Sequence, residues 1–543
     1  MKLEDLTPRQ REVVDTTEPV VVVLGGPGTG KTTTALWAGR VMLERPGIAS
    51  WHRVLFLTFS RTAVGQIARR APGVFGSGGG RIDIATFHAF AWRLIRAFGR
   101  YNGHGVKPPM LESEARARLL GRDRTRLSYD DLIPAARKLL SSQRLLGLVL
   151  QRWPLVICDE FQDTNDEQWK LLTLLGKGGR LLLLGDPNQM IYTFLSHTGV
   201  GPKRLEEARR IATRVIDLEL RSHRDPSGAI PAMAEAVRRR RFTDRAVVHA
   251  VHTGRLTVIP DVVDTGLTNV IAGEVARIRA AGASTVGIFG HSNEGVAELG
   301  AALIEAGVDH VLVGIAEAHG EALVALATLC GFAAGTASSE EVRVQLATFL
   351  TACTRGRTAP DLAIQMARGR GLPRVFGERL TALERALREP SSATLGDVLP
   401  IATNAWRGLG VTRGVRPWQR ASVDFAALSR RFLGRPMDDA SVRQVLAAAA
   451  HRRAGALVDF DTAQQSPVEL MNFHQTKGRE ADAVLLVYRD GDYLAAARDD
   501  EPFEEPSRVL FVSLSRARRT VTVILPPDPH PLVAPFLMAA RAG

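Results

Sequence analysis

The stretch VVVVLGGPGTGKTT, residues 20–33, decides how the rest of the sequence is interpreted. Its valines and leucine form a continuous apolar run, as in a strand buried on both faces. A glycine-rich segment follows with Gly25, Gly30, Lys31 and Thr32 at the spacing G-x-x-x-x-G-K-T, and the helical sequence TTALWAGRVMLE comes next. Strand, loop and helix in this order predict a phosphate-binding loop, and a plain glycine-rich turn is the weaker alternative.

The residue types of this loop suit a nucleoside triphosphate with magnesium, so we predict ATP and Mg²⁺ as ligands. Glycines let backbone N–H groups converge on phosphate oxygens at a helix N-terminus. Lys31 can reach the β and γ phosphates, and the hydroxyl of Thr32 can ligate the metal. The predicted nucleotide-binding residues of the loop are Gly25, Gly28, Gly30, Lys31, Thr32 and Thr33.

The bulk properties are those of a large basic protein. A chain of 543 residues is too long for one core, and roughly 150 residues per domain predicts three or four domains. Lys and Arg number 70 against 57 Asp and Glu, a net charge of +13, which favours a polyanionic partner such as nucleic acid. Many basic proteins are merely soluble, so the charge alone does not decide the partner.

Cysteine usage and the apolar runs predict the compartment. Cys158, Cys330 and Cys353 are scattered, without the spacing of a disulfide framework or a zinc site. The N-terminal MKLEDLTPRQ lacks the apolar core of a signal peptide, and no apolar run approaches the roughly 18 residues of a membrane span. We therefore expect a cytoplasmic protein without a membrane partner.

Alternating β-type runs and helical patterns predict an α/β fold of parallel sheets flanked by helices. The first region supplies strands at 20–25, 53–59, 81–87, 155–160 and 181–186. The second supplies strands at 284–290, 310–314, 468–473, 483–488 and 520–526. A long Ala-, Leu- and Arg-rich helical stretch interrupts the second region at about 320–455, and a smaller polar and helical insert interrupts the first at about 98–150.

LVICDEFQDT places Asp159 and Glu160 at the carboxyl end of a buried strand. Adjacent buried carboxylates are costly unless a cation is present, so Asp159 suits the magnesium shell. Glu160 can orient and deprotonate the attacking water, which distinguishes a hydrolase from a simple nucleotide-binding protein. A purely structural ion pair is the alternative.

Aromatic residues follow several of these strands. In LLLLGDPNQMIYTF, Gln189 can sense a γ-phosphate, and Tyr192 and Phe194 follow within five residues. Single strands are bound without sequence preference by stacking bases on aromatic faces, at about 1–3 kcal/mol per base. Such aromatics are more often core residues, but the pattern recurs at Phe59, with Arg61 beside it, and around His88. We predict a nucleic-acid surface at these residues.

These motifs, in this order, resemble the superfamily 1 helicases of the UvrD, Rep and PcrA type. LTPRQREVV resembles the Q motif, LTFSRTAVGQIARR motif Ia, TFHAF motif Ib, CDEFQDT motif II, GDPNQMIYTF motif III and SHRDP motif IV. VELMNFHQTKGREADAVLLV resembles motif V and SRVLFVSLSRARR motif VI. The resemblance implies two RecA-like lobes that close on ATP and advance along a single strand in the 3′ to 5′ direction.

The resemblance also assigns roles that the residues alone do not. It implies that Gln10 reads the adenine edge, that Arg224 contacts the γ-phosphate with Arg221 as a fallback, and that Arg516 is the second arginine finger. It adds His223 and Glu480 to the nucleotide site, and Asn472 and His474 to the nucleic-acid site. The implied domains are 1A (1–97 and 151–216), 1B (98–150), 2A (217–318 and 456–543) and 2B (319–455).

The sequence departs from the family pattern at four positions. His223 replaces the usual adenine-stacking Tyr, Asn472 the usual Thr, Arg479 the usual Leu and Leu195 the usual Arg. An imidazole can still stack on adenine, so nucleotide binding is least affected. Loss of the Arg and of the Thr hydroxyl removes expected strand contacts, which weakens the expectation of duplex separation.

The leading hypothesis is an ATP-dependent helicase or translocase on single-stranded and duplex DNA, in repair, replication restart or recombination. The alternative is a DNA-stimulated ATPase that serves as a sensor or regulatory subunit, like the helicase-like partner in the Gabija anti-phage system, with protein partners in repair or defence. A nuclease is not expected, because only some 24 residues follow motif VI.

Overall fold

The fold is described from a computed structural model, which covers residues 3–76, 80–99, 110–121, 126–192, 197–218, 224–312, 317–354, 358–389, 394–457, 467–492, 494 and 501–542. The chain divides into two compact units, each assembled from separate segments. Unit 1 comprises residues 1–87, 140–314 and 462–543, and unit 2 comprises 88–139 and 315–461. Among the helices of the described residues, none has the length and apolar character needed to cross a lipid bilayer.

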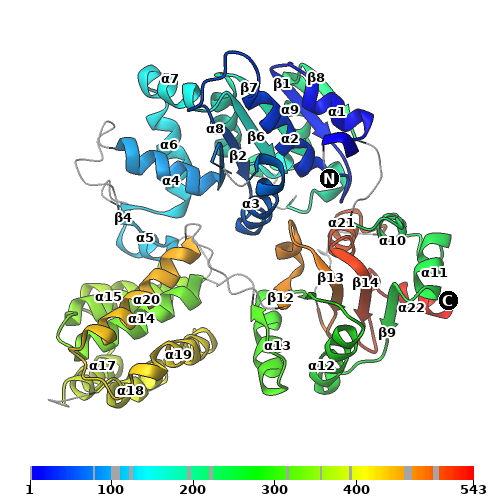
Figure 1. Cartoon of the computed structure of the whole chain (residues 1–543). Helices are drawn as coiled ribbons and strands as arrows, with labels where there is room; N and C mark the ends of the chain where they lie inside the picture. The colour runs from blue at the N-terminus through cyan, green and yellow to red at the C-terminus, as the bar shows by residue number, and fades with distance from the viewer. Residues whose placement is uncertain are drawn as a thin grey trace. The chain divides into compact units, whose positions relative to one another are not determined.

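The first sheet of unit 1 is parallel throughout. Its strand order is β3 (Ile82–Thr86), β2 (Val54–Thr58), β6 (Leu155–Asp159), β7 (Arg180–Gly185), β1 (Val20–Leu24) and β8 (Arg214–Asp217). The apolar strands β2, β6 and β7 are buried along their whole length, because helices cover the sheet (Figure 1). The carboxyl ends of these strands therefore meet along one edge of the sheet.

Some helices of the first sheet, namely α1 (Pro8–Asp15), α3 (Arg61–Phe75) and α8 (Asp166–Gly176), begin at a side-chain cap. Its other helices are α2 (Lys31–Leu43), α7 (Gln143–Arg152) and α9 (Pro202–Ile211). Thr7 and Gln10 form a capping box at α1, and Asn165 and Gln168 form another at α8. Helix α2 starts at Lys31 itself, directly after the glycine-rich loop.

The second sheet of unit 1 is also parallel. Its strand order is β11 (Val311–Leu312), β12 (Val468–Asn472), β10 (Val286–Gly290), β13 (Ala481–Val487), β14 (Ala517–Ile524) and β9 (Leu256–Ile259). Its helices are α10 (Ala229–Arg238), α11 (Arg245–His252), α12 (Asp264–Ala280), α13 (Asn293–Glu305), α21 (Glu504–Leu514) and α22 (Phe536–Ala542). The strands thus come from both sides of the long helical insertion, as the sequence predicts.

Unit 2 is mainly helical. Its helices are α4 (Phe87–Phe98), α5 (Glu114–Leu120), α6 (Leu132–Leu139), α14 (Glu317–Ala333), α15 (Ser339–Ala352), α16 (Asp361–Arg368), α17 (Arg374–Arg388), α18 (Leu395–Gly408), α19 (Val415–Ser429) and α20 (Ala440–Leu457). Phe349, Trp406 and Trp418 pack together at its centre, with ring centroids 4.5–5.5 Å apart. The insert around residues 98–150 also contains a short parallel pair, β4 (Met110–Leu111) with β5 (Arg126–Leu127).

The predicted fold class is confirmed: two RecA-like parallel sheets carry helical insertions. Each predicted strand has a counterpart, but β8 and β9 had not been predicted. β8 lies at the edge of its sheet, where Val215 is exposed. Polar residues are tolerated at such an edge, so the sequence RVID of β8 is not a continuous apolar run. The four domain ranges remain a prediction, since the compact units group the segments differently.

Candidate active site

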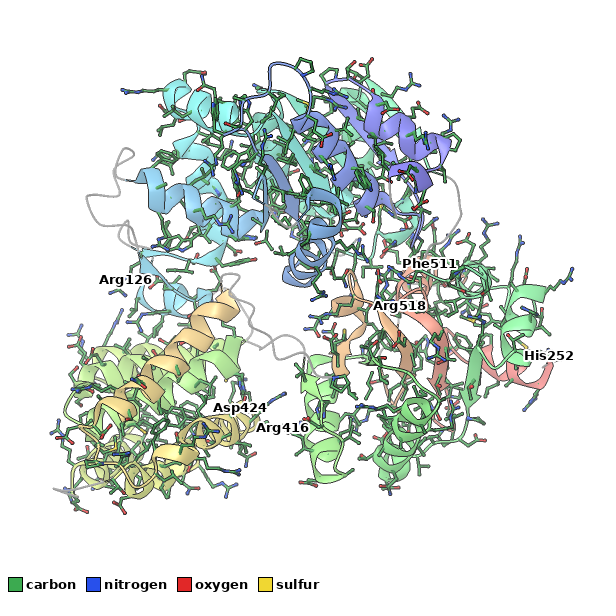
Figure 2. All side chains as sticks on the ribbon, in the orientation of Figure 1. Arg126, His252, Arg416, Asp424, Phe511 and Arg518 are labelled. Atoms are coloured by element: carbon green, nitrogen blue, oxygen red, sulfur yellow. The ribbon has the colours of Figure 1, made fainter. Side chains whose placement is uncertain are left out.

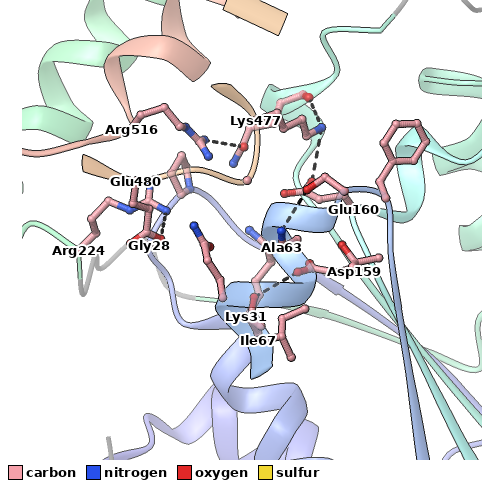
Figure 3. Close-up of a pocket in the computed structure, with 18 of the residues that line it drawn as sticks. Gly28, Lys31, Ala63, Ile67, Asp159, Glu160, Arg224, Lys477, Glu480 and Arg516 are labelled. Carbon is pink, nitrogen blue, oxygen red and sulfur yellow. Dashed lines mark hydrogen bonds and ion pairs between the residues drawn. The ribbon is translucent and has the colours of Figure 1, made fainter. Parts of the chain in front are cut away.

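A cavity of about 410 Å³ lies in unit 1 at the carboxyl ends of the first sheet's strands. Residues of both sheets line it, and they face one another in Figure 3. The first sheet contributes the loop 27–33 and the ends of β2, β6 and β7; the second contributes segments near β13 and β14. The predicted catalytic residues among its lining are Lys31, Asp159, Glu160, Gln189, Arg224 and Arg516.

The glycine-rich loop wraps around the Lys31 amine. Gly28 (φ 76°) and Gly30 (φ 83°) take the left-handed conformation, which residues with a Cβ rarely adopt. Lys31 Nζ donates to the carbonyl oxygens of Gly25 (2.6 Å) and Gly26 (3.0 Å). A Cβ on Gly25 would lie 2.7 Å from Thr29 Oγ1, so glycine is also required there. The loop is therefore closed at the N-terminus of α2, where an anion binds favourably.

Thr32 and Asp159 form an oxygen pair beside this loop. The Thr32 hydroxyl, on the first turn of α2, donates to Asp159 Oδ2 (3.3 Å) at the end of β6. Burial, followed by the neighbouring Glu160, raises the pKa of Asp159 to about 6. The structure thus brings together the two residues predicted to ligate magnesium.

Glu160 has a strained backbone and an ionised side chain. Its φ of 53° and ψ of 44° place a non-glycine residue in the left-handed region, a strain that often occurs at functional sites. Burial raises the pKa of Glu160, but Lys477 and Lys31 outweigh it, and the pKa lies below its ordinary value. Gln162 Nε2 donates to Glu160 Oε2 (2.5 Å) and orients the carboxylate. An ionised carboxylate fixed in this way is chemically able to accept a proton.

Gln189 is held at three atoms. It ends the short 3-10 helix Pro187–Gln189, directly after β7, and its Nε2 donates to Asp186 Oδ2 (2.6 Å). Its Oε1 accepts from Arg516 Nη2 (2.8 Å), and its backbone oxygen accepts from Lys477 Nζ (2.6 Å). Lys477 lies between β12 and β13, and Arg516 directly precedes β14, so both donors belong to the second sheet. Gln189, which follows a strand of the first sheet, therefore joins the two sheets at the cavity.

Lys477 lies among the carboxylates of the CDEFQDT segment, although the sequence predicts no role for it. Its amine lies 2.6 Å from Asp163 Oδ2 and 3.6 Å from Glu160 Oε2, and only 7% of the residue is exposed. Burial lowers the pKa of Lys477, but Asp163 and Glu160 outweigh it and the pKa lies above its ordinary value. The motif V resemblance marked the segment, but its spacing does not show that the amine reaches motif II.

The predicted arginine residues differ in their surroundings. Arg516 is buried, donates to Gln189 and to the Val512 carbonyl oxygen (2.8 Å), and burial lowers its pKa to about 10. Arg224 donates to the Ser515 carbonyl oxygen (2.6 Å) and to Glu480 Oε1 (2.6 Å). Both guanidinium groups reach the cavity, and Arg224 is oriented by Glu480.

Gln10 and His223 are the two residues expected near adenine, and of these the structure describes Gln10. Gln10 is 2% exposed; its Nε2 donates to the Thr29 carbonyl oxygen (3.0 Å) and its Oε1 accepts from Thr7 N (2.9 Å). Its amide thus supports the glycine-rich loop and α1, and its reading of adenine stays a prediction. Thr33 lines the cavity. His223 and Arg221 lie outside the described residues.

Phe59 and Tyr192 line one side of the cavity, and His474 lies next to Tyr192. The ring centroids of Phe59 and Tyr192 are 5.7 Å apart, and those of Tyr192 and His474 are 6.4 Å apart. Tyr192 is half-buried rather than fully exposed, since its hydroxyl donates to the His474 carbonyl oxygen (3.0 Å) and burial raises its pKa to about 12. Burial and nearby His291 lower the pKa of His474, so that imidazole is neutral near pH 7.

Of the other predicted nucleic-acid residues, His88 and Asn472 have contacts of their own in the described part of the chain. His88 belongs to unit 2, where it stacks on Tyr129 with centroids 3.6 Å apart. Asn472 Oδ1 caps the 3-10 helix Phe473–Thr476 by accepting from Gln475 N (2.9 Å). Phe194 and Leu195 lie outside the described residues, as does the Arg61 side chain at the start of α3.

Arg479, which replaces a Leu of the family pattern, forms an ion pair. Its Nη1 lies 2.8 Å from Glu469 Oε2 on β12, and its side chain is 17% exposed. The substitution is therefore accommodated by a carboxylate on the neighbouring segment of the second sheet.

Comparisons with known proteins agree with this architecture. A family model described as an AAA domain matches residues 10–195. ATP-dependent DNA helicase UvrD2 of Mycobacterium tuberculosis is 26% identical over 608 residues, covering 94% of this chain and 77% of the relative. DNA helicase II of Escherichia coli is 25% identical over 258 residues, covering 35% of this chain and 34% of the relative.

A shorter similarity extends to one further relative. RecBCD enzyme subunit RecB of Mycolicibacterium smegmatis is 42% identical over 71 residues, which cover 12% of this chain and 7% of the relative. The AAA-domain match, these relatives and the two RecA-like sheets make this chain similar to DNA helicases of the UvrD and PcrA type.

Proposed function

We propose that this chain hydrolyses ATP to move along single-stranded DNA in the 3′ to 5′ direction and to unwind duplex DNA, in repair, replication restart or recombination. The observation that carries the proposal is the position of Gln189. Gln189 contacts Arg516 and Lys477 at the cavity. It lies three residues before Tyr192, which belongs to the aromatic cluster of Phe59, Tyr192 and His474. The direction and the pathways are taken from the family resemblance.

The residues around Thr32 and Asp159 fit a magnesium ion. Hydroxyl and carboxylate oxygens are the ligands that magnesium prefers, and Asp159 lies where burial opposes its ionisation. When bound with the nucleotide, the ion would neutralise phosphate charge. The loop from Gly28 to Thr33 and the Lys31 amine would hold the phosphates, because backbone N–H groups and a cation converge there.

The remaining residues fit the roles of a hydrolase. Glu160 is ionised and held by Gln162, so it can accept a proton from water. Arg224 and Arg516 bring fixed positive charge to the cavity, where charge on the transferring phosphoryl group is stabilised. Gln189, bonded to Arg516, is placed to respond to the state of the phosphates.

The same residues support a link between hydrolysis and the DNA strand. A change at the phosphates that moves Arg516 or Lys477 also moves Gln189, and Tyr192 follows in the chain. Tyr192 also contacts the second sheet directly, through the carbonyl oxygen of His474. We propose that Phe59, Tyr192 and His474 contact the strand and that this cluster is rearranged during each ATP cycle.

The test combines ATPase assays with strand displacement. We expect single-stranded DNA to stimulate hydrolysis, and a 3′-tailed duplex to be separated in preference to a 5′-tailed one. Lys31→Ala and Glu160→Gln should abolish turnover while DNA binding is largely kept, because these residues lie at the cavity and not in the aromatic cluster. ATPase activity unchanged in either variant would refute the site assignment.

One observation favours the second candidate, a DNA-stimulated ATPase sensor without processive unwinding. The Asn472 side chain, which replaces an expected strand contact, is used to cap a 3-10 helix. Fewer strand contacts would weaken duplex separation more than ATP hydrolysis. Stimulation of the ATPase without displacement of either tailed duplex would support this candidate over the helicase.

A further inference from the structure

The Glu480 carboxylate, at the rim of the cavity, is shared by arginine side chains. Its Oε1 lies 2.6 Å from Arg224 Nη2 and 3.3 Å from Arg70 Nη2, and its Oε2 lies 2.9 Å from Arg518 Nη2. Burial raises the pKa of Glu480, but Arg224 and Arg70 outweigh it and hold the pKa far below its ordinary value. The carboxylate is therefore ionised, and each of its oxygens has a guanidinium partner.

A β-bulge aims Arg518 at this carboxylate. The strands β13 and β14 are paired on both sides of the bulge, at Ala481–Ala517 and Ala483–Thr520. Between these pairs, Arg518 and Arg519 together lie opposite the single residue Asp482. Bulges re-aim side chains and are frequent next to active sites. Arg518 reaches Glu480, whereas Arg519 Nη1 donates to the Gly282 carbonyl oxygen (2.9 Å).

Asp482 holds Arg518 from the other side. Its Oδ1 lies 3.8 Å from Arg518 Nη1, and its Oδ2 accepts from the backbone N–H groups of Ser284 (2.8 Å) and Thr285 (3.1 Å). Those backbone groups precede β10 and are fixed by the second sheet. A chain of contacts thus runs from the backbone of the sheet through Asp482 and Arg518 to Glu480. Figure 2 labels Arg518 beside these strands.

We propose that Arg518 is a positioning residue that holds the Glu480 carboxylate in the orientation in which it accepts hydrogen bonds from the sugar hydroxyls of the nucleotide. The inference rests on the proposed function. A carboxylate repels phosphates but accepts hydrogen bonds from donor groups, and the sugar hydroxyls are the donor groups of the nucleotide that lie nearest to its phosphates. Neither composition nor motif spacing assigns a role to Arg518.

The test compares binding and hydrolysis of ATP and 2′,3′-dideoxy-ATP by the full chain and its variants. For Arg518→Ala we expect KM for ATP to rise about tenfold with kcat within about twofold, the effect of one charge-assisted hydrogen bond lost from substrate binding. Preference for ATP over the dideoxy nucleotide should shrink in parallel. Arg518→Lys should recover part of both effects, because it restores the positive charge.

Arg519→Ala is the matched control, since Arg519 neighbours Arg518 but turns to Gly282. Its KM and its preference for the sugar hydroxyls should equal those of the wild type. The inference is overturned if Arg518→Ala leaves KM and the preference unchanged, or if it lowers kcat alone. Failure of the wild type to bind or hydrolyse ATP would instead refute the proposed function, and with it the substrate on which this inference depends.

Discussion

Asp159 is a buried carboxyl whose ionisation is opposed by its surroundings. Its pKa is raised to about 6, by burial and then by Glu160. Because this pKa lies above that of a free aspartate, the contribution of Asp159 to the free energy of unfolding is favourable in acid. It is lost as the pH rises through about 6. A cation bound by Asp159 would offset this cost, so metal binding and proton release are linked.

We therefore predict that the affinity of the ADP-loaded chain for Mg²⁺ falls between pH 7.5 and pH 5.5. With a pKa of about 6, the ionised fraction of Asp159 falls roughly fourfold over this range, and affinity should fall with it. Isothermal titration calorimetry, corrected for Mg²⁺ binding to free ADP, measures the change. Thr32→Ala should bind more weakly with the same pH dependence, whereas a pH dependence that survives in Asp159→Asn would contradict the assignment.

Tyr192 combines a ring and a hydroxyl whose effects can be separated. Tyr192→Phe keeps the ring but removes the hydrogen bond to the His474 carbonyl oxygen. We expect it to bind single-stranded DNA normally and to lose part of the DNA stimulation of ATPase activity. Tyr192→Ala should also lose affinity, by about 1–3 kcal/mol for one stacked base. Fluorescence anisotropy and ATPase assays with oligo-dT measure the two effects.

Tyr488→Phe is the control for the Tyr192 variants, since it removes a hydroxyl from a ring stacked on Phe473 in the core of the second sheet. It should change neither DNA affinity nor stimulation. Normal affinity in Tyr192→Ala would make its ring a core residue and would remove the base-stacking role.

At the residue scale, the sequence predicts the side chains that lie at the ends of apolar strands. Lys31, Asp159 and Gln189 follow apolar strands, so their meeting at one sheet edge could be deduced. The contacts of Lys477 and Arg518 could not, because no strand-end pattern indicates which residue either side chain meets. The bulge that directs Arg518 depends on strand register, which the alternation of residues does not reveal.

At the scale of elements, helices of unit 2 from distant parts of the chain cap one another. Glu317, the first residue of α14, accepts from the Ala115 N–H (2.8 Å) in the first turn of α5. Arg118, on α5, donates to the carbonyl oxygens of Thr351 (3.1 Å) and Thr354 (3.2 Å) at the end of α15. An anion at a helix N-terminus and a cation at a C-terminus both oppose the helix dipole favourably.

Arg118→Ala should lower the free energy of unfolding of unit 2 by about 1–2 kcal/mol, because it leaves carbonyl groups at the end of α15 without their cationic donor. Urea denaturation, followed by tryptophan fluorescence, measures the loss. Arg374→Ala is the control: this side chain is 91% exposed and pairs along its own helix with Glu378, so the change should stay within about 0.5 kcal/mol. Equal stability of both variants would contradict the capping role.

The element boundaries were predictable where burial leaves a clear pattern. Buried strands such as β6 and β7 match their predicted positions to within about a residue. β8 and β9 are short strands, and β8 lies at a sheet edge where polar residues are tolerated, so alternation or an apolar run is missing. The pair β4–β5 has the same limitation, since each strand is only 2 residues long.

At the scale of the whole molecule, the described cavity residues all belong to unit 1, although unit 1 consists of separate chain segments. Unit 2 has its own buried core around Trp406 and Trp418. Binding of a ligand to a native state stabilises the unit that contains the site, by about 2.7 kcal/mol at a concentration a hundredfold above Kd.

We predict that Mg²⁺ and a non-hydrolysable ATP analogue raise the unfolding temperature of unit 1 and leave that of unit 2 nearly unchanged. Differential scanning calorimetry can resolve the two transitions, and the Arg118→Ala variant identifies the transition of unit 2. In Lys31→Ala the analogue should give a smaller shift, because a phosphate contact is lost. Equal shifts of both transitions would show that the nucleotide stabilises the chain as a single cooperative unit.

The interleaved strand order of the second sheet has a consequence for synthesis on the ribosome. The first sheet is complete when Asp217 has been made, but β10 acquires its neighbours β12 and β13 only after Val487. Until Asn472 has been made, the apolar residues of β10 have no strand on either side, so a nascent chain needs protection from aggregation at this stage. Lys477 and Arg516 also emerge late, so a growing chain has its glycine-rich loop long before the lining of the cavity is complete.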